Sequence, residues 1–301
     1  MSPLVATILA PCFVLPTAPD VESDTSAKPV PEYQLVYKFR KGQEVHYEVS
    51  QTTKRLSRQS QAQQLVTDTV REDKHLSVVD VTDDGSFVLK TVFERVRMNA
   101  DFGNKKVVFD SQKPKTEDPP GFARFRKQIS KPQFHVLFEP TGKLKAVRRL
   151  AAGKGADDKS AGKGNDGSSF LVVFPKDPVK IGGTWREEYT VKLPISRELI
   201  RSIEVLRTYR LNTVKDGIAK ISFASSLKTP VKNPEFLAKL VQVAPSGTIE
   251  FDIDDGVIAK RTIRVDKTVL NHSGPGSLLQ TVSKRVEKRV MPTEQKTAST
   301  E

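Results

Sequence analysis

The chain has 301 residues, of which 37% are hydrophobic and 28% are charged, and its formal net charge is +13. This length allows one large domain or two modest ones. The single cysteine, Cys12, lies in the N-terminal apolar stretch, so the mature region is expected to have neither a disulfide nor thiol chemistry. The basic residues are interleaved with acids, and no zinc-finger, helix-turn-helix or RNP signature occurs. These features argue against sequence-specific binding of nucleic acid.

The N-terminal residues 1–18 have the features of a secretory signal. Residues 3–15 are almost wholly apolar, in a run too short and too interrupted by proline to span a membrane comfortably. We therefore predict export to the periplasm or cell envelope, with no transmembrane span in the mature protein; a cytoplasmic protein with an apolar start is the alternative. The residues before Cys12 are similar to a lipoprotein cleavage box, although Pro11 departs from it, so lipidation stays open. Residues 19–32 are polar and contain proline, which predicts a disordered tether.

Residues 33–150 carry the signals of a first β-rich unit. A strand is expected over residues 42–49, where a glycine precedes β-branched and aromatic residues. An Asp-Gly pair at positions 84–85 lies between two alternating apolar runs and predicts a tight hairpin turn. Residues 118–129 change to the apolar spacing of a short helix, and residues 134–144 return to two strands joined by a polar glycine turn.

Residues 170–290 repeat this series in the same order. A strand is expected over residues 183–191, and a second Asp-Gly pair at positions 216–217 predicts a second hairpin. The segment 233–241 predicts a short helix, with Asn233 as its N-cap and a proline in its first turn. Residues 248–258 again give a strand, a glycine turn and a strand.

Three further segments complete the predicted organisation. Residues 151–169 are a low-complexity run rich in glycine and lysine, and they predict a flexible loop between the two units. The last strand of the second unit is expected over residues 259–269, and residues 291–301 are expected to form a disordered tail. The densest basic run, residues 284–289, lies near that tail and is interpreted as part of a solvated basic surface.

The matching order of segments predicts the fold. It favours an internal duplication, with chance recurrence of common strand-turn-strand patterns as the alternative. The predicted class is α+β and β-rich, with two related curved antiparallel sheets in a half-barrel-like arrangement, or one long sheet built from two repeats. Because a curved sheet must bury one face, each half is expected to cover its concave face with its short helix.

A search for reactive groups assigns no catalytic, cofactor-binding or metal-binding residue. His46, His75, His135 and His272 lack HxxxH or HExxH spacing, and no GxSxG nucleophile motif occurs. The acidic run 252–256 is interpreted as a turn, with adventitious calcium as the alternative. We therefore expect a protein that is not an enzyme and has no cofactor. A hydrolase with dispersed carboxylates stays open, because such a site needs no local motif.

The apolar stripes of the two predicted helices and the single tryptophan are the candidate lining of an apolar-ligand site. These residues either plug the core or line a cavity for an acyl chain or a similar ligand. They are Phe122, Phe125, Ile129, Trp185, Phe236, Leu237 and Leu240.

Four segments carry a resemblance to a known group of proteins. The segment FPKDPVKIGGTW at 174–185, with YKFRKGQEVHYEV at 37–49, FEPTG at 138–142 and FDIDDG at 251–256, resembles a family of exported bacterial proteins of unknown function, of planctomycete type. Gly183 stands where that family usually has aspartate. The pattern of strands and helices is also loosely similar to the half-barrels of periplasmic lipoprotein carriers. The resemblance implies an envelope protein with an apolar cavity and transfers no catalytic residue.

Two functional hypotheses follow. The first is a non-enzymatic envelope protein that binds a lipid or another apolar ligand in a cavity under the helices. The second is a structural or interaction protein whose basic surface contacts anionic envelope polymers or partner proteins.

Overall fold

The computed structural model describes residues 31–129, 134–149, 171–194 and 200–291. The predicted signal-like segment, most of the tether, the low-complexity loop and nearly all of the C-terminal tail lie outside these residues. None of the described helices is long and apolar enough to cross a membrane. The predicted domain boundaries stay predictions.

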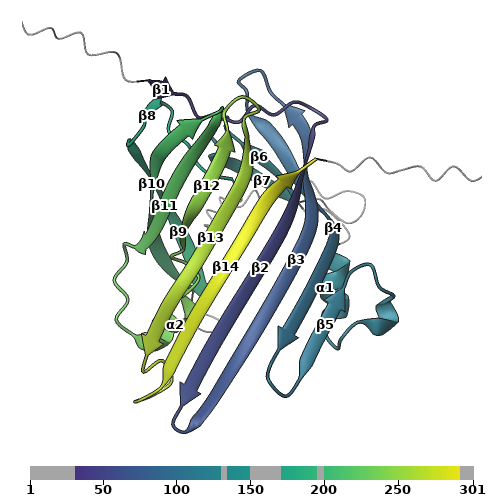
Figure 1. Cartoon of the computed structure of the whole chain (residues 1–301), viewed down its shortest axis with the longest axis vertical. Helices are drawn as coiled ribbons and strands as arrows, with labels where there is room; N and C mark the ends of the chain where they lie inside the picture. The colour runs from purple at the N-terminus through teal and green to yellow at the C-terminus, as the bar shows by residue number, and fades with distance from the viewer. Residues whose placement is uncertain (1–30, 130–133, 150–170, 195–199, 292–301) are drawn as a thin grey trace, which may run out of the picture. The chain divides into compact units, whose positions relative to one another are not determined.

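One antiparallel sheet of twelve strands dominates the described part of the chain (Figure 1). The first half of the chain contributes β2 (Glu44–Gln59), β3 (Ala62–Val81), β4 (Phe87–Asp101), β5 (Lys106–Asp110), β6 (Phe134–Phe138) and β7 (Leu144–Arg149). The second half contributes β9 (Thr184–Pro194), β10 (Ile200–Lys215), β11 (Ile218–Leu227), β12 (Ser246–Asp252), β13 (Val257–Leu270) and β14 (Leu278–Val290). Outside this sheet lie the pair β1 (Glu32–Tyr33) and β8 (Val179–Lys180), the 3₁₀ turn η1 (Lys115–Glu117) and the helices α1 (Phe122–Ile129) and α2 (Pro234–Lys239).

The two halves of the chain join where a strand near the start of the chain pairs with the last strand. The strand order is β7-β6-β4-β3-β2-β14-β13-β12-β11-β10-β9, with β5 paired to β4. Strand β14, the last strand of the chain, therefore lies beside β2, the first strand of this sheet. Strands β7 and β9, which follow one another in this sheet along the chain, lie at opposite ends of the order. The predicted β-rich fold of curved antiparallel strands with two short helices is confirmed. It takes the form of one long sheet.

Both halves contain the same order of elements around their helices. In the first half, α1 lies before the pair β6 and β7; in the second half, α2 lies before the pair β12 and β13. Gly85 and Gly217 close the two predicted hairpins with positive φ of 77° and 73°, a conformation that glycine adopts without strain. The shared order agrees with the predicted duplication, and a common origin of the halves stays a prediction.

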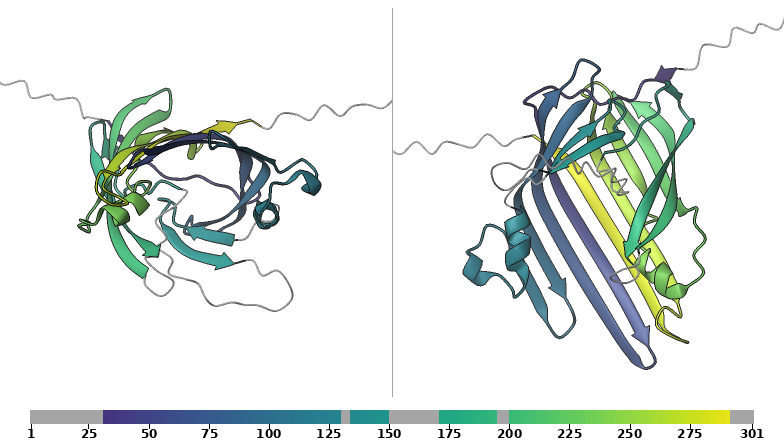
Figure 2. Two further views of the ribbon diagram at one scale, coloured as in Figure 1. Left: turned by 90° about the horizontal axis from the view of Figure 1, so that it is seen from below. Right: turned by 180° about the vertical axis from the view of Figure 1, so that it is seen from behind.

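The sheet curls so that its inner face holds the core (Figure 2). On β2, for example, the inward residues Val45, Tyr47 and Val49 are buried and alternate with more exposed residues. The largest core cluster combines aromatic side chains from both halves. Tyr37 of the first half, for example, packs against Phe251 of the second half at a ring-centroid distance of 5.6 Å. Two smaller clusters lie beside the helices, one at α1 and one at the C-terminal end of α2.

Candidate ligand-binding cavity

The inner face of the curled sheet lines a cavity of about 1390 Å³. Its walls come from strands of both halves, from α1 and from the segment that follows α2. This volume exceeds the roughly 300–1,000 Å³ of ordinary small-molecule pockets. Apolar side chains make up most of the wall, among them Phe93, Val96, Met98, Phe223, Ile249 and Ile263.

The alternation of β3 and β4 explains why one wall of the cavity is largely apolar. Val70 on β3 and Val96 and Met98 on β4 point inward, as expected for side chains of one parity in paired strands. The register shifts between Asp73 and Lys74, so one extra residue of β4 forms a β-bulge at Glu94. The bulge keeps both Phe93 and Val96 on the cavity side although they lie three residues apart.

Helix α1 brings its predicted stripe to this wall. Phe125 and Ile129 line the cavity, and Phe122 lines a smaller pocket of about 280 Å³. All three pack with Phe109 of β5 in one cluster, in which the rings of Phe109 and Phe122 are 5.0 Å apart. The structure therefore places Phe125 and Ile129 in the wall of the main cavity and Phe122 in the wall of the smaller pocket, and their role in ligand binding stays a prediction.

The other predicted residues lie in packed regions. Trp185 is buried in the main core, stacks on Tyr209 at 5.2 Å and donates a hydrogen bond from its Nε1 to the carbonyl of Val173 at 2.8 Å. Leu240 is buried against Leu193 and Ile203. Phe236 and Leu237 are half-buried on α2. None of these four candidates is among the described lining residues, and the second half contributes instead Gln242, Val243 and Pro245 after α2.

A buried ion cluster crosses the inner face at β3, β14 and β13. The carboxylate of Glu287 is 6% exposed and lies 2.6 Å from the Lys74 ammonium, and it accepts a hydrogen bond from Arg261 Nε at 3.0 Å. Burial by itself would raise the pKa of Glu287. The neighbouring charges of Arg261 and Lys74 outweigh burial and lower this pKa to about 2. The carboxylate is therefore ionised at neutral pH.

Two further arginines place guanidinium groups at the cavity wall. Arg285 donates to both carboxylate oxygens of Glu72, at 3.2 and 2.9 Å, and to the Gln51 side chain at 3.1 Å. Arg207 donates to the Tyr189 hydroxyl at 2.7 Å and lies over the Tyr189 ring, 4.9 Å from its centroid. The cavity thus combines an apolar wall with fixed positive groups.

Sequence reasoning missed these charged residues because it treated basic side chains as solvated surface. A signal was present, since Lys74 has the same strand parity as the apolar residues Leu76 and Val78. A charged residue at an inward-facing position of a half-buried strand is removed from water, and it therefore needs an oppositely charged partner.

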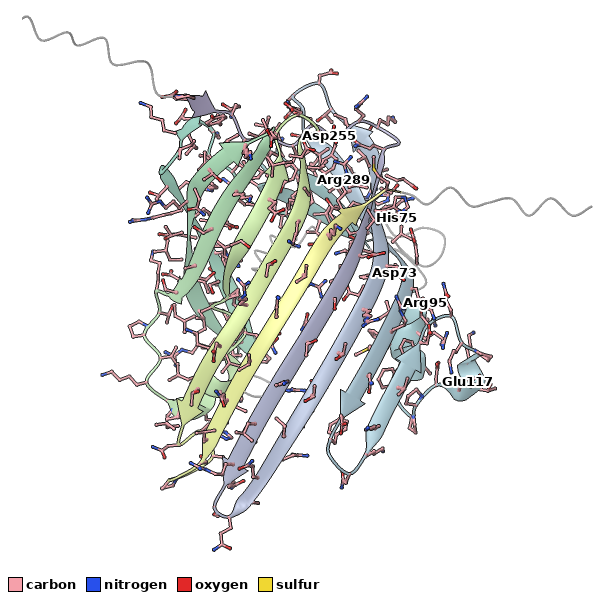
Figure 3. The ribbon with its side chains drawn as sticks, viewed as in Figure 1. Asp73, His75, Arg95, Glu117, Asp255 and Arg289 are labelled. Carbon is pink, nitrogen blue, oxygen red and sulfur yellow. The ribbon has the colours of Figure 1, made fainter. Side chains whose placement is uncertain are left out.

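On the opposite face of the sheet, three side chains of metal-ligating type lie close together. Among the described residues, only Glu44, His46 and His75 form such a group, with one ligand atom from each within 4.8 Å of the others. His75 is labelled on β3 in Figure 3. The predicted absence of metal ligands rested on spacing within one strand, which does not detect residues paired across two strands.

Comparisons with known proteins give a family match for the second half and weak structural likenesses. The structure reported as "Lipid-protein interactions in lipovitellin" aligns with 84% of this chain and 26% of that chain, at 10% identity and a TM-score of 0.43. The chain thus spans about a quarter of that lipovitellin chain. DynF from the dynemicin biosynthesis pathway of Micromonospora chersina aligns with 93% of this chain and 95% of that chain, at 8% identity and a TM-score of 0.22.

Neither structural likeness is close enough to carry an argument about function. No curated protein matches the chain. Residues 166–267, which include β8 to most of β13, match the model of a family of unknown function, DUF6263. This match agrees with the predicted resemblance to a family of unknown function.

Proposed function

We propose that this is an exported, non-enzymatic binding protein that holds a lipid or another apolar ligand with an anionic head group. One observation carries the proposal: a cavity of about 1390 Å³ combines a mainly apolar wall with a local excess of cationic side chains. Export is supported by the apolar N-terminal residues 3–15.

The apolar part of the wall suits an acyl chain. Transfer of apolar surface from water to such a wall is favourable by about 25 cal/mol per Å². The wall includes Phe125 and Ile129 of α1 together with Phe93, Val96 and Met98 of β4. Because these residues adjoin one another at one side of the cavity, they form a continuous apolar surface for a flexible chain.

The charged part of the wall suits an acidic head group. Among the described lining residues, the only carboxylate is Glu72, whereas the cations are Lys74, Lys192, Arg207, Arg261 and Arg285. Glu187 and Glu287 lie behind the wall as partners of these cations, so the described residues set five cationic groups against three carboxylates. A ligand carboxylate or phosphate would balance this excess where the surroundings are less polar than water.

A substitution in the cavity wall tests the proposal without touching the core. Phe134 lines the cavity although its side chain is 42% exposed, and Phe102 is 38% exposed in a turn away from the cavity. We expect Phe134→Asp to weaken binding of a fluorescent long-chain fatty acid at least tenfold, because a new carboxylate would face the ligand. Phe102→Asp is the matched control and should bind as the unchanged protein does.

The same probe as its methyl ester tests the head group. The proposal expects the free acid to bind the delipidated full-length chain more tightly than the ester. Equal binding of the acid and the ester would still support an apolar ligand, but it would contradict the proposed anionic head group. No binding of either probe would overturn the binding function.

The net charge of +13 supports a second candidate, an interaction protein that contacts anionic envelope polymers. In that case the chain would sediment with an anionic polysaccharide in a salt-dependent way, and neither cavity probe would bind.

A further inference from the structure

Two histidines face each other on the outer side of the sheet. His46 of β2 and His75 of β3 are directly opposed in the strand register, and their ring centroids are 5.0 Å apart. Their neighbours Val45 and Leu76 point into the core, so both imidazoles lie on the face opposite the cavity. The side chains of His46 and His75 are 21% and 14% exposed, which leaves them partly shielded and still accessible to an ion.

Two carboxylates flank this histidine pair. Glu44 lies two residues before His46, so its side chain is on the same face of β2. Glu94 is the extra residue of the β-bulge on β4, opposite β3. Bulges re-aim side chains and are common beside functional sites. Four side chains from three neighbouring strands therefore converge at one place.

The contacts with Glu94 distinguish the two nitrogens of the histidine rings. Glu94 Oε1 forms a hydrogen bond with Nδ1 of His75 at 2.7 Å and an ion-pair contact with Nδ1 of His46 at 3.1 Å. An ionised carboxylate only accepts hydrogen bonds, so the bond to His75 favours a hydrogen on Nδ1 of that ring, and the same oxygen lies beside Nδ1 of His46. In the neutral ring, the lone pair is then on Nε2. The Nε2 atoms of His75 and His46 face Glu44, at 3.5 and 3.7 Å from its carboxylate oxygens.

We propose that this cluster is a binding site for a divalent transition metal of the zinc class. His46 Nε2, His75 Nε2 and a Glu44 oxygen are its ligands, and Glu94 is the positioning residue that orients both imidazoles. Imidazole and carboxylate are ligands that zinc and its neighbours accept. A carboxylate that accepts from the second ring nitrogen is the usual companion of a zinc-bound histidine.

The distances between the three proposed ligand atoms are short enough for the side chains to bind one ion together. One ligand atom from each of Glu44, His46 and His75 lies within 4.8 Å of the others. Ligands at about 2.0–2.1 Å in a tetrahedral site are roughly 3.3 Å apart, so the side chains need only short movements inward. Three protein ligands leave a fourth position for water or for a ligand atom from another molecule.

Titration of metal into the full-length chain tests this site. After treatment with a chelator, calorimetric titration with zinc sulfate should saturate at one zinc ion per chain. His75→Ala should weaken zinc binding at least a hundredfold, because it removes one of three ligands. The matched control is His135→Ala, since His135 lies on β6 and does not belong to the described group of metal-ligating side chains.

The role of Glu94 has its own readout. We expect Glu94→Ala to weaken zinc binding by about 10–100-fold, as for other carboxylates behind a histidine ligand. In the Glu94→Ala variant, the visible absorption bands of bound Co²⁺ should keep their intensity, because this substitution leaves the number of metal ligands unchanged. Glu44→Gln should instead change that spectrum, because Glu44 contributes a ligand atom.

Two results would overturn the proposal. One is the absence of zinc binding at millimolar zinc, which would leave the cluster as histidine–glutamate ion pairs alone. The other is unchanged binding in His75→Ala when far-UV circular dichroism shows that this variant is folded. Because the cluster and the cavity lie on opposite faces of the sheet, neither result bears on the binding of an apolar ligand.

Discussion

Glu287 shows how a single residue in a charged run can be structural. It belongs to residues 284–289, which the sequence alone indicated as solvated surface, yet it is buried on the inner face of β14. Its neighbours Lys284 and Lys288 point outward and are exposed. Strand alternation therefore divides one charged run between solvent and a buried ion cluster.

We predict that Glu287→Gln lowers the free energy of unfolding by about 3–5 kcal/mol, because it leaves Lys74 and Arg261 buried without their common counter-charge. The midpoint of urea unfolding at pH 7 measures this change. Glu48→Gln is the matched control, since Glu48 is exposed on the adjacent strand. Its effect should stay within about 0.5 kcal/mol. Equal effects of the two substitutions would contradict the buried role of Glu287.

The same residue predicts a pH dependence. The pKa of Glu287 is lowered to about 2 in the folded protein, from an ordinary value of 4.5. A group with a lowered pKa contributes stability that is present above the unfolded pKa and is lost as pH falls through the folded pKa. The contribution of Glu287 should therefore decrease from about pH 5 to about pH 2. Urea midpoints over this range should fall less steeply for Glu287→Gln than for the unchanged protein.

At the scale of the element, the β6–β7 turn shows why one glycine matters more than another. Gly142 has a φ of +82°, and an added Cβ would meet the carbonyl oxygen of Val172 at 2.3 Å and the Tyr37 ring at 2.6 Å. The Tyr37 hydroxyl accepts from Val172 N at 2.9 Å, so backbone and ring are held together there. The turn, the N-terminal segment and the lead-in to β8 thus pack as one unit.

A pair of substitutions separates strain from steric contact. Gly103 has a similar φ of +87° and open space around it. We expect Gly103→Ala to lower the free energy of unfolding by about 1–2 kcal/mol, because a residue with a Cβ is strained in a left-handed conformation. Gly142→Ala should cost about 1–3 kcal/mol more, because its neighbours must also move. Thermal unfolding of both variants gives the difference, and equal costs would show that the turn can open without penalty.

At the scale of the whole sheet, the pairing of β14 with β2 makes the two halves one structure. Thirteen residue pairs join these strands, from Leu278–Arg58 to Val290–His46. The main core cluster also combines residues of both halves. We therefore expect the halves to unfold together and not as independent domains.

Trp185 provides the measurement for this cooperativity, because it is the only tryptophan and lies in the second half. Its fluorescence should change at the same urea concentration as the far-UV circular dichroism, which reports on strands of both halves. Two separated transitions would show that the sheet divides at the β2–β14 pairing.

Local signals were enough to predict several elements. The side chain of Asn233 accepts from the backbone N–H groups of Glu235 and Phe236, at 2.8 and 3.4 Å, as its predicted N-cap role requires. The Asp-Gly pairs predicted the hairpins that precede β4 and β11. In these places the chemistry that selects the structure lies within a few residues of the chain.

The sequence by itself therefore determined the fold class, the two helices, most strands of each half and the apolar stripe of α1. Strand β14 escaped prediction because its inward positions carry the charged residues Arg285 and Glu287, whose partners lie on β3 and β13. The hairpin between β2 and β3 turns at residues 60–61 without glycine, with Ser60 at a φ of 53°. The register that sets His46 opposite His75 was therefore not evident from local signals. Only the tertiary structure decided which charges are buried and which side chains meet, because those contacts depend on pairing between residues far apart in the chain.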